Sequence, residues 1–572
     1  MTSGKSVGQT LSSALHAYVP ITNWLPRYVR GWLKRDLLVG LLSWGTTVPS
    51  SMGYAQLAGL PVQAGLYASM VGLLVYGILG SSKQLKVGTS ASMAVLSGAI
   101  VAFFAVGDEA YYIALSAALA IIVGLMLIAL GAAKVSFISD FLAKPIIGGF
   151  LFGLAVIIII ARLPTLFGIT VDGNSPLTQL LLLITSLDET ILATLAVSVV
   201  SILILLSFWR FLPRFPGAIA ILVLGILASA ALDLEQYGVA LVGRLPSGLP
   251  SITVPNVRLE DVLLLTVGAL AVVLVALADS LGTARAFARE NRYRIDLDQE
   301  LLAIGFSNLG AGLFQGMAVG ANTGITAGAS GAKVRTQLAS IVTALLIVAT
   351  LLTQINLISY LPEAVLAIAV ILSVTHMLNR AEFRREYRIS KFDFILALVT
   401  LVGVLIAGIL PGLIFAVILS LGMVLLRSGR PRVTILGRLA GHSAFVEIGE
   451  HPDAEPLPGL LIVRPDVALY FANANSSLQE IRSLVARATE PPEVLVLVLG
   501  ASNTLDISST DMLATLFEEL KEQGIRLAIA NARSEARASM QLAGTIDLVG
   551  DQNLYLSVQE AVDAISSSSG PQ

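Results

Sequence analysis

KVGTSASMAVLSGA, residues 86–99, and GMAVGANTGITAGASGAKVRTQLAS, residues 316–340, are the two stretches that decide the fold. Both are rich in small and hydroxylated residues and lie between apolar runs, yet neither holds a full apolar span. A helix that starts inside a membrane exposes unpaired backbone N–H groups, and its macrodipole adds partial positive charge there. Two such half-helices that face each other form an anion site without any basic side chain. The alternative interpretation is close helix packing, in which small residues are also enriched.

The composition places most of the chain in a membrane. Hydrophobic residues make up 55% of its 572 residues, charged residues 13%, and the mean hydropathy is +0.83, whereas a soluble domain is about 25% charged. The net charge of −2 does not indicate a basic surface that would bind nucleic acid. The absence of Cys excludes disulfides and thiol catalysis. No metal cluster, nucleophile–base pair or nucleotide-binding motif is recognisable, so we expect neither an enzyme nor a cofactor other than Na⁺ or H⁺ as a coupling ion.

Apolar runs of membrane-spanning length repeat along the first three quarters of the chain. A spanning helix needs about 20 apolar residues. We predict fourteen spans, at residues 36–56, 63–80, 88–106, 110–133, 144–163, 190–209, 217–233, 260–284, 299–315, 321–332, 336–356, 362–377, 392–409 and 411–427.

The distribution of basic residues supports this count. Lys and Arg gather before the first span and after even-numbered spans, as at Lys83, Lys86, Lys134 and Arg289. The positive-inside rule then places both termini in the cytoplasm, and we expect a multi-pass protein of the inner membrane. Seven spans in each half make residues 86–99 and 316–340 the third span of each half, which is the arrangement of an inverted repeat.

One acid lies well inside a predicted span. Asp279 follows an unbroken apolar run, and Thr283 lies four residues later on the same helical face. An acid at this depth usually faces a cavity or a partner, so the pair indicates a site for Na⁺ or H⁺. The alternative is a structural acid paired with Arg285. In the first span, Pro49 predicts a kink, and Tyr54 lies either in the wall of a binding cavity or at the membrane interface.

Charge density changes after residue 427, which gives the domain organisation. We predict a cytoplasmic segment at 1–35, a transmembrane domain at 36–427, a linker at 428–435, an α/β domain at 436–566 and a disordered tail at 567–572. Residues 493–533, EVLVLVLGASNTLDISSTDMLATLFEELKEQGIRLAIANAR, alternate strand, helix and strand. The helix opens with capping residues and closes with Gly.

Three long motifs carry a family resemblance: DLLVGLLSWGTTVPSSMGYAQLAGLP (36–61), GLYASMVGLLVYGILGSSKQLKVG (65–88) and ARAFARENRYRIDLDQELLAIGFSNLGAGLFQG (284–316). From about Trp24 to Ile565, the chain resembles the SulP (sulfate permease) family of anion transporters, including a C-terminal STAS domain. The resemblance implies a polytopic α-helical membrane protein of fourteen spans in a 7+7 inverted repeat, divided into core and gate domains that move as an elevator. It also implies a homodimer and a substrate such as sulfate, bicarbonate, chloride or a dicarboxylate, in some members with Na⁺ or H⁺ coupling.

The resemblance also implies site residues. The anion site would be formed by the third span, the tenth span and Tyr54, and the cation site by the eighth span. The matching residues are Gly88, Thr89, Ser90 and Ala91, then Asn322, Thr323, Gly324, Ile325 and Thr326, and for the cation Asp279 and Thr283.

The chain departs from the family pattern at the expected site. Thr89 and Ser90 stand where the family commonly has Pro and often an acid, and Ser50 and Ser51 stand where it often has Gln and Gly. Ile325 replaces a frequent Arg, so helix dipoles and hydroxyls would carry more of the anion binding.

The α/β domain resembles STAS domains in which a Ser at a helix N-terminus is phosphorylated. Ser508 and Ser509 are the nearest matches, and the alternative is that they only cap the helix. Protein partners at this domain are therefore an expectation. Overall we expect a secondary active anion transporter. The alternatives are an uncoupled channel or exchanger, or a transport-poor scaffold that acts through STAS.

Overall fold

The structure is a computed structural model that describes residues 18–102, 104, 108–137, 144–171, 173, 175–211, 217–243, 248–353, 358–429, 432–442, 444–488 and 490–568. It divides into two compact units, Met1–Ser420 and Leu421–Gln572, each described by itself below. Residues 1–17 of the predicted N-terminal segment and residues 569–572 of the predicted tail lie outside the described residues.

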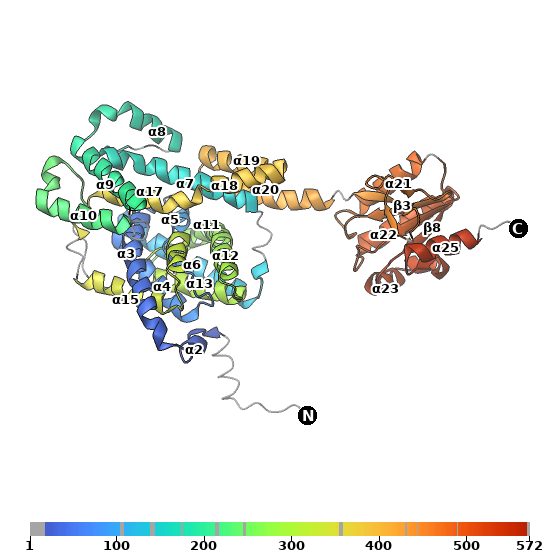
Figure 1. The fold of residues 1–572 in the computed structure, drawn as a ribbon, viewed down its shortest axis with the longest axis horizontal. Helices are drawn as coiled ribbons and strands as arrows, with labels where there is room; N and C mark the ends of the chain where they lie inside the picture. Colours follow the sequence, from blue (N-terminus) through green and yellow to red (C-terminus); the bar gives the residue numbers. More distant parts are fainter. Residues whose placement is uncertain are drawn as a thin grey trace, which may run out of the picture. The chain divides into compact units, whose positions relative to one another are not determined.

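Helices make up most of the first unit (Figure 1). They are α2 (Ile21–Trp24), α3 (Leu33–Leu57), α4 (Val62–Leu79), α5 (Ala91–Val101), α6 (Glu109–Ala132), α7 (Lys144–Phe167), α8 (Pro176–Thr185), α9 (Leu192–Phe211), α10 (Gly217–Leu232), α11 (Leu259–Ala276), α12 (Gly282–Glu290), α13 (Leu297–Leu313), α14 (Thr323–Gly331), α15 (Leu338–Thr353), α17 (Glu363–Val374), α18 (Arg380–Ile389), α19 (Lys391–Ala407) and α20 (Ile409–Gly429), which runs into the second unit. A π-helical turn, Leu277–Leu281, joins α11 to α12.

The predicted spans coincide with helices of the structure. Five described helices are by themselves long and apolar enough to cross a membrane, namely α4, α6, α7, α9 and the continuous helix Leu259–Glu290. The third and tenth predicted spans are short helices, with 11 residues in α5 and 9 in α14. Helices α8 and α18, of 10 residues each, are additions that the span count did not contain.

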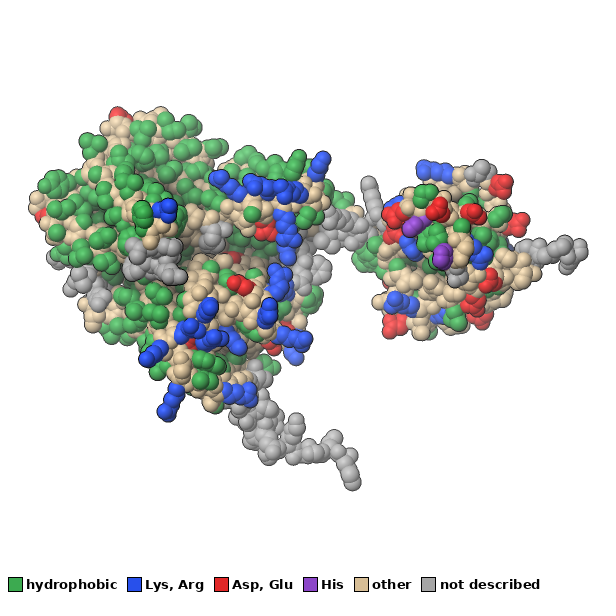
Figure 2. All heavy atoms as spheres, viewed as in Figure 1, with side chains coloured by type: hydrophobic (Ala, Val, Ile, Leu, Met, Phe, Trp, Pro, Cys, Tyr) green, Lys and Arg blue, Asp and Glu red, His purple; other side chains and the backbone are tan. Residues whose placement is uncertain are grey.

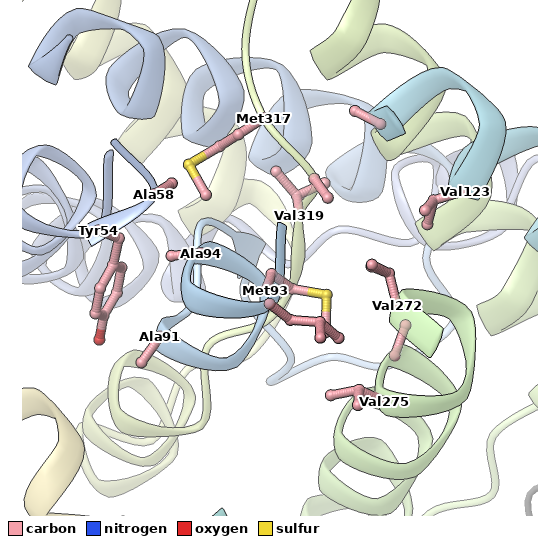
Figure 3. Close-up of a cluster of buried hydrophobic side chains, with 14 of the residues drawn as sticks. Tyr54, Ala58, Ala91, Met93, Ala94, Val123, Val272, Val275, Met317 and Val319 are labelled. Carbon is pink, nitrogen blue, oxygen red and sulfur yellow. The ribbon is translucent and has the colours of Figure 1, made fainter. Parts of the chain in front are cut away.

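Close helix contacts through glycine build the centre of this unit. A Cβ on Gly124 of α6 would lie 2.7 Å from the carbonyl oxygen of Gly305 of α13, and a Cβ on Gly305 would lie 2.9 Å from the Gly124 carbonyl. Figure 1 shows α6 and α13 together with α4, α11 and α12, and α7, α17 and α18 in a neighbouring layer. In Figure 3, the Met93 side chain of α5 points between Val319 and the helix that carries Val272. The half-helix α5 is therefore packed among helices on several sides.

The second unit is an α/β domain. Its strands are β3 (Val433–Leu439), β4 (Phe445–Glu447), β5 (Ala454–Glu455), β6 (Leu460–Pro465), β7 (Val494–Val498), β8 (Arg526–Ala530) and β9 (Leu554–Tyr555). They form a sheet in the order β4-β3-β6-β7-β8-β9, with β5 paired to β3. Strands β6 to β9 are parallel, and β3 is antiparallel to its neighbours.

Helices of the second unit connect and cover this sheet. They are α21 (Ala474–Arg487), α22 (Ile507–Glu522), α23 (Ser534–Leu542), α24 (Thr545–Val549) and α25 (Val558–Ser568). One apolar core contains residues of α21 to α24, and a second core contains residues of α25. Strand β3 begins at Val433, within the segment predicted as a linker.

Candidate anion-binding site

Two short strands bring the two half-helices together. β1 (Val87–Gly88) pairs antiparallel with β2 (Gly320–Ala321). Helix α5 begins at Ala91, shortly after β1, and α14 begins at Thr323, shortly after β2. Because the strands run in opposite directions, the helices leave the ribbon in opposite directions and their N-termini meet at it. Segments more than 200 residues apart are thus joined at their helix starts.

Each half-helix carries an N-cap. The Ser90 Oγ accepts a hydrogen bond from the Met93 N–H at 3.4 Å, and the Asn322 Oδ1 accepts one from the Ile325 N–H at 3.1 Å. Each cap uses the third N–H of its helix, and the two N–H groups before it are the donors that remain for an anion. The positive ends of two helix dipoles add to these donors.

A cavity of about 870 Å³ lies against the start of α14. Four of the predicted residues line it: Tyr54, Asn322, Gly324 and Ile325. The other lining residues come from α3, α10, α14 with the residue after it, and α17, and they are Leu42, Ser43, Thr46, Pro49, Ser50, Ala218, Ala327, Gly328, Gly331, Ala332, Ala369, Leu372 and Ser373. Among these described residues none is charged. The Tyr54 hydroxyl donates to the Ser373 Oγ at 2.7 Å, which joins α3 to α17 across the cavity wall.

The predicted residues around the start of α5 lie behind this wall. Gly88, Thr89, Ser90 and Ala91 are buried and are not among the described residues that line the cavity. A Cβ on Gly88 would lie 3.0 Å from the Ser69 Oγ and 3.4 Å from the Ser69 Cβ, so the backbone before α5 lies close against α4. The start of α5 is therefore fixed by tight contact with α4.

The Thr89 hydroxyl belongs to a buried triangle of hydroxyl groups. Its Oγ1 lies 3.0 Å from the Ser51 Oγ and 2.9 Å from the Ser69 Oγ, and these two oxygens are 2.7 Å apart. The Thr89 N–H also donates to the Ser69 Oγ at 3.0 Å. The three side chains are 0–1% exposed, so this cluster ties α3, α4 and the start of α5 together.

Asp279 lies in the π-helical turn and lines a second cavity of about 250 Å³. Thr283 and Thr323 line the same cavity, and their hydroxyl oxygens are 2.9 Å apart. The predicted pair Asp279 and Thr283 thus lines one cavity. Thr323, which was predicted for the anion site, lines the same cavity. Carboxylate and hydroxyl oxygens suit Na⁺, and the carboxylate alone suits H⁺. A π turn is frequent at functional sites.

Hydrogen bonds connect this second cavity to both half-helices. The Asp279 Oδ2 accepts from the Ser92 Oγ at 3.0 Å, and the Ser92 Oγ is 3.2 Å from the Ser90 Oγ at the cap of α5. The Ser280 Oγ accepts from the Ala321 N–H of β2 at 2.9 Å. The acid is therefore linked through side chains to the start of α5, and its neighbour is linked to the strand before α14.

Lys86 was predicted as a loop residue, but the structure buries it. It is 1% exposed, and its ammonium donates to the Ser340 Oγ at 2.8 Å. Its backbone N–H donates to the Thr326 Oγ1, and its carbonyl accepts from the Asn322 N–H. Thr326 therefore supports the ribbon rather than the described cavity wall. No sequence signal distinguished this lysine from the basic loop residues around it.

In the second unit, the two predicted serines differ in exposure. Ser508 is exposed, whereas Ser509 is 0% exposed and donates its hydroxyl to the Asp506 Oδ1 at 2.7 Å. The Asp506 carboxylate also accepts from the N–H groups of Ser509 and Phe471. Burial alone would raise the pKa of Asp506, but these hydrogen bonds outweigh it and lower the pKa. Asp506 is therefore the side chain that caps α22.

Comparison with known families assigns both units. Residues 33–400 match the Sulfate permease family, and residues 451–561 match the STAS domain. The chain is 34% identical over 559 residues to the Probable sulfate transporter Rv1739c of Mycobacterium tuberculosis, which covers 97% of this chain and 99% of that protein. It is 29% identical over 566 residues to the chloroplastic Sulfate transporter 4.1 of Arabidopsis thaliana, which covers 95% and 82% of the two chains.

Solved structures share the fold. The murine Solute Carrier 26 family member A9 anion transporter in the inward-facing state has a TM-score of 0.88 at 23% identity, covering 99% of this chain and 96% of that one. The transmembrane domain of the cyanobacterial bicarbonate transporter BicA has a TM-score of 0.60 at 20% identity, covering 69% and 97%. At these identities the likeness concerns the fold alone.

Proposed function

The chain belongs to the sulfate permease family, and from this membership we propose that it is a secondary active transporter that binds a small anion between its two half-helices. The family is one of anion transporters, not of enzymes. Sulfate and bicarbonate are the leading substrate candidates, since relatives are named for sulfate and a structural neighbour for bicarbonate. A dicarboxylate is a further candidate that rests on the family resemblance.

One observation carries the proposal: two capped helix starts meet at a ribbon beside a cavity whose described lining holds no charged side chain. The start of α14 lines this cavity, so a cation there would meet a positive dipole end, whereas an anion would find backbone donors. The cavity volume of about 870 Å³ accommodates a partly hydrated small anion. Ile325 contributes an apolar wall where the family often carries Arg. Weak binding by dipoles would favour rapid release.

We place the coupling ion at Asp279. Its carboxylate shares a cavity with the hydroxyls of Thr283 and Thr323, and Thr323 is the first residue of α14. Binding of Na⁺ or H⁺ would neutralise the Asp279 carboxylate, which accepts a hydrogen bond from Ser92 of α5. Removing this negative charge would make the nearby anion site more favourable, which is the energetic basis of symport.

The composition of the cavity wall supports an alternating-access mechanism. One side consists of α3 and α14, which are fixed to the ribbon, and the other side consists of α10 and α17. We propose elevator movement of the first group against the second, with the Tyr54–Ser373 hydrogen bond among the contacts that break. Homodimerisation, an inner-membrane location and cytoplasmic termini rest on the family resemblance and on the distribution of basic residues.

Uptake by proteoliposomes tests the function. Sulfate, bicarbonate, chloride, fumarate and succinate are offered to the purified full chain while Na⁺ and pH are varied. Saturable uptake that depends on Na⁺ or pH supports a coupled transporter. Saturable uptake without that dependence supports an exchanger, and non-saturating flux supports a channel. Absence of flux from a folded protein supports a scaffold that acts through STAS.

A further inference from the structure

Helix α18 lies at the level where a membrane helix begins. It ends at Ile389, and α19 begins at Lys391, so only Ser390 separates them. The Ser390 Oγ accepts from the Asp393 N–H, which makes Ser390 the N-cap of α19. Because α19 coincides with the predicted span 392–409 and the connection is one residue long, α18 is expected at the interfacial layer of the bilayer.

The outer face of α18 is basic. Four arginines of this helix, Arg380, Arg384, Arg385 and Arg388, are exposed. Residues 379–391 contain five basic and two acidic residues. Figure 2 shows Lys and Arg side chains gathered over the region where Figure 1 labels α18 and α19. Guanidinium groups bind phosphate through paired hydrogen bonds, so this face suits phosphodiester groups.

Apolar and aromatic side chains accompany the arginines. Tyr387 is 54% exposed, Ile389 72% and Phe392 50%. The Tyr387 ring packs edge-on against Phe394 of α19, with centroids 5.3 Å apart. Exposed apolar and aromatic groups beside basic ones are typical of a helix that lies at a lipid headgroup layer. This combination favours a lipid surface over a soluble phosphate compound.

The inner face of α18 covers the cavity that contains Asp279. Asn379, Glu382 and Phe383 line that cavity together with Thr283. The Phe383 ring lies 5.1 Å from the Phe152 ring of α7, which anchors α18 at the cavity edge. One short helix therefore has the bilayer surface on one side and the candidate coupling site on the other.

We propose that α18 binds anionic phospholipid headgroups through its arginine face, and that this binding holds the helix over the Asp279 cavity. Near an anionic surface each basic residue strengthens attraction by about fivefold. Losing two arginines should then weaken lipid binding by about 25-fold. The lipid-binding part stands on the α18 surface alone, whereas an effect on transport rests on the function proposed above.

The test uses the full chain in two vesicle compositions, phosphatidylcholine alone and phosphatidylcholine with phosphatidylglycerol. Lipid binding is measured by native mass spectrometry, α18 mobility by amide hydrogen exchange, and transport by anion uptake. The test variant is the double substitution R384Q/R388Q, which changes neither lining residues of the cavity nor the anion site. The matched control is K521Q/R526Q, which removes two positive charges from the second unit.

We expect phosphatidylglycerol to bind the wild type, slow exchange in α18 and raise uptake severalfold. R384Q/R388Q should lose most of all three effects, and K521Q/R526Q should keep them. Equal phosphatidylglycerol binding by the wild type and R384Q/R388Q would overturn the proposal. The proposal would also be overturned if soluble glycerol phosphate, added to wild type in phosphatidylcholine vesicles, had the same effect as phosphatidylglycerol. That result would indicate a site for free phosphate compounds. A third outcome separates the two proposals: R384Q/R388Q loses lipid binding, but no protein takes up anion in either vesicle. This outcome would support lipid binding by α18 and would contradict the proposed transport function.

Discussion

The Thr89 hydroxyl of the segment before α5 lies 3.0 Å from the Ser51 hydroxyl of α3, and both side chains are fully enclosed with Ser69. Ser51 and Thr89 stand at two positions where the chain departs from the family pattern, so these departures are in physical contact. The hydroxyl of Thr89 points to neighbouring helices and not into the described cavity. It therefore positions the start of α5.

Replacing Thr89 with Val tests this positional role. The substitution keeps the shape of the side chain, but the buried hydroxyls of Ser51 and Ser69 each lose a hydrogen bond to Thr89. This loss should lower the free energy of unfolding by about 1–3 kcal/mol. We expect a lower thermal unfolding temperature in detergent and an anion affinity within about twofold of wild type. The control is Thr266→Val, because the Thr266 hydroxyl donates to the Val262 carbonyl of its own helix. A large loss of affinity at unchanged stability would instead make Thr89 an anion ligand.

Replacing Asp279 with Asn should separate anion uptake from its coupling ion. The amide retains an acceptor for the Ser92 hydroxyl but cannot bind H⁺ and holds Na⁺ poorly. We expect uptake that no longer responds to Na⁺ or pH, at a reduced rate. Ser92→Ala removes the hydrogen bond and keeps the carboxylate, so the ion response should remain. Unchanged Na⁺ and pH dependence in Asp279→Asn would remove Asp279 from the coupling site.

The cap of α22 predicts a pH dependence within the second unit. Because hydrogen bonds lower the pKa of Asp506 below its ordinary value of 3.8, its stabilising contribution is complete above that value. The contribution is lost as the pH falls through the lower folded-state pKa. Asp506→Ala should cost about 1 kcal/mol at neutral pH and remove this acid response. Hydrogen exchange of the first turn of α22 in the full chain measures both effects.

Ser508→Ala provides the control for the cap, because Ser508 is exposed. Its exchange should match wild type at every pH. Faster exchange in Ser508→Ala than in Asp506→Ala would contradict the assignment of Asp506 as the cap.

The positions of the spanning helices along the chain could be predicted because each long apolar run indicates one span. The predicted spans coincide with helices, and the weak spans at 88–106 and 321–332 correspond to the half-helices α5 and α14. Helix α18 was not predicted, since arginines that follow a predicted span indicate a cytoplasmic loop by the positive-inside rule and do not by themselves indicate a helix. Its amphipathic role depends on a one-residue connection to α19 that periodicity does not reveal.

The site could be predicted only in part, because side-chain direction depends on tertiary contacts. Tyr54, Asn322, Gly324 and Ile325 do line one cavity, but Thr89 turns toward α3 and α4. Likewise Thr323 was predicted for the anion and lies in the cavity of Asp279. Thr89 and Thr323 each lie at or next to a helix start, where a shift of one residue along the helix changes the cavity that the side chain faces.

Equilibrium anion binding to Gly324→Leu tests whether the anion lies between the half-helices. Gly324 lines the 870 Å³ cavity at the start of α14, and a leucine there would fill space beside the backbone donors. The matched control is Gly282→Leu, because Gly282 lines the Asp279 cavity and a Cβ on it meets nothing within 4 Å. Radiolabelled sulfate binding to purified protein, with the other candidate anions as competitors, gives the affinity of each variant.

We expect Gly324→Leu to weaken anion binding by about tenfold or more and Gly282→Leu to bind as wild type does in the absence of Na⁺. Wild-type affinity in a folded Gly324→Leu protein would contradict the half-helix site.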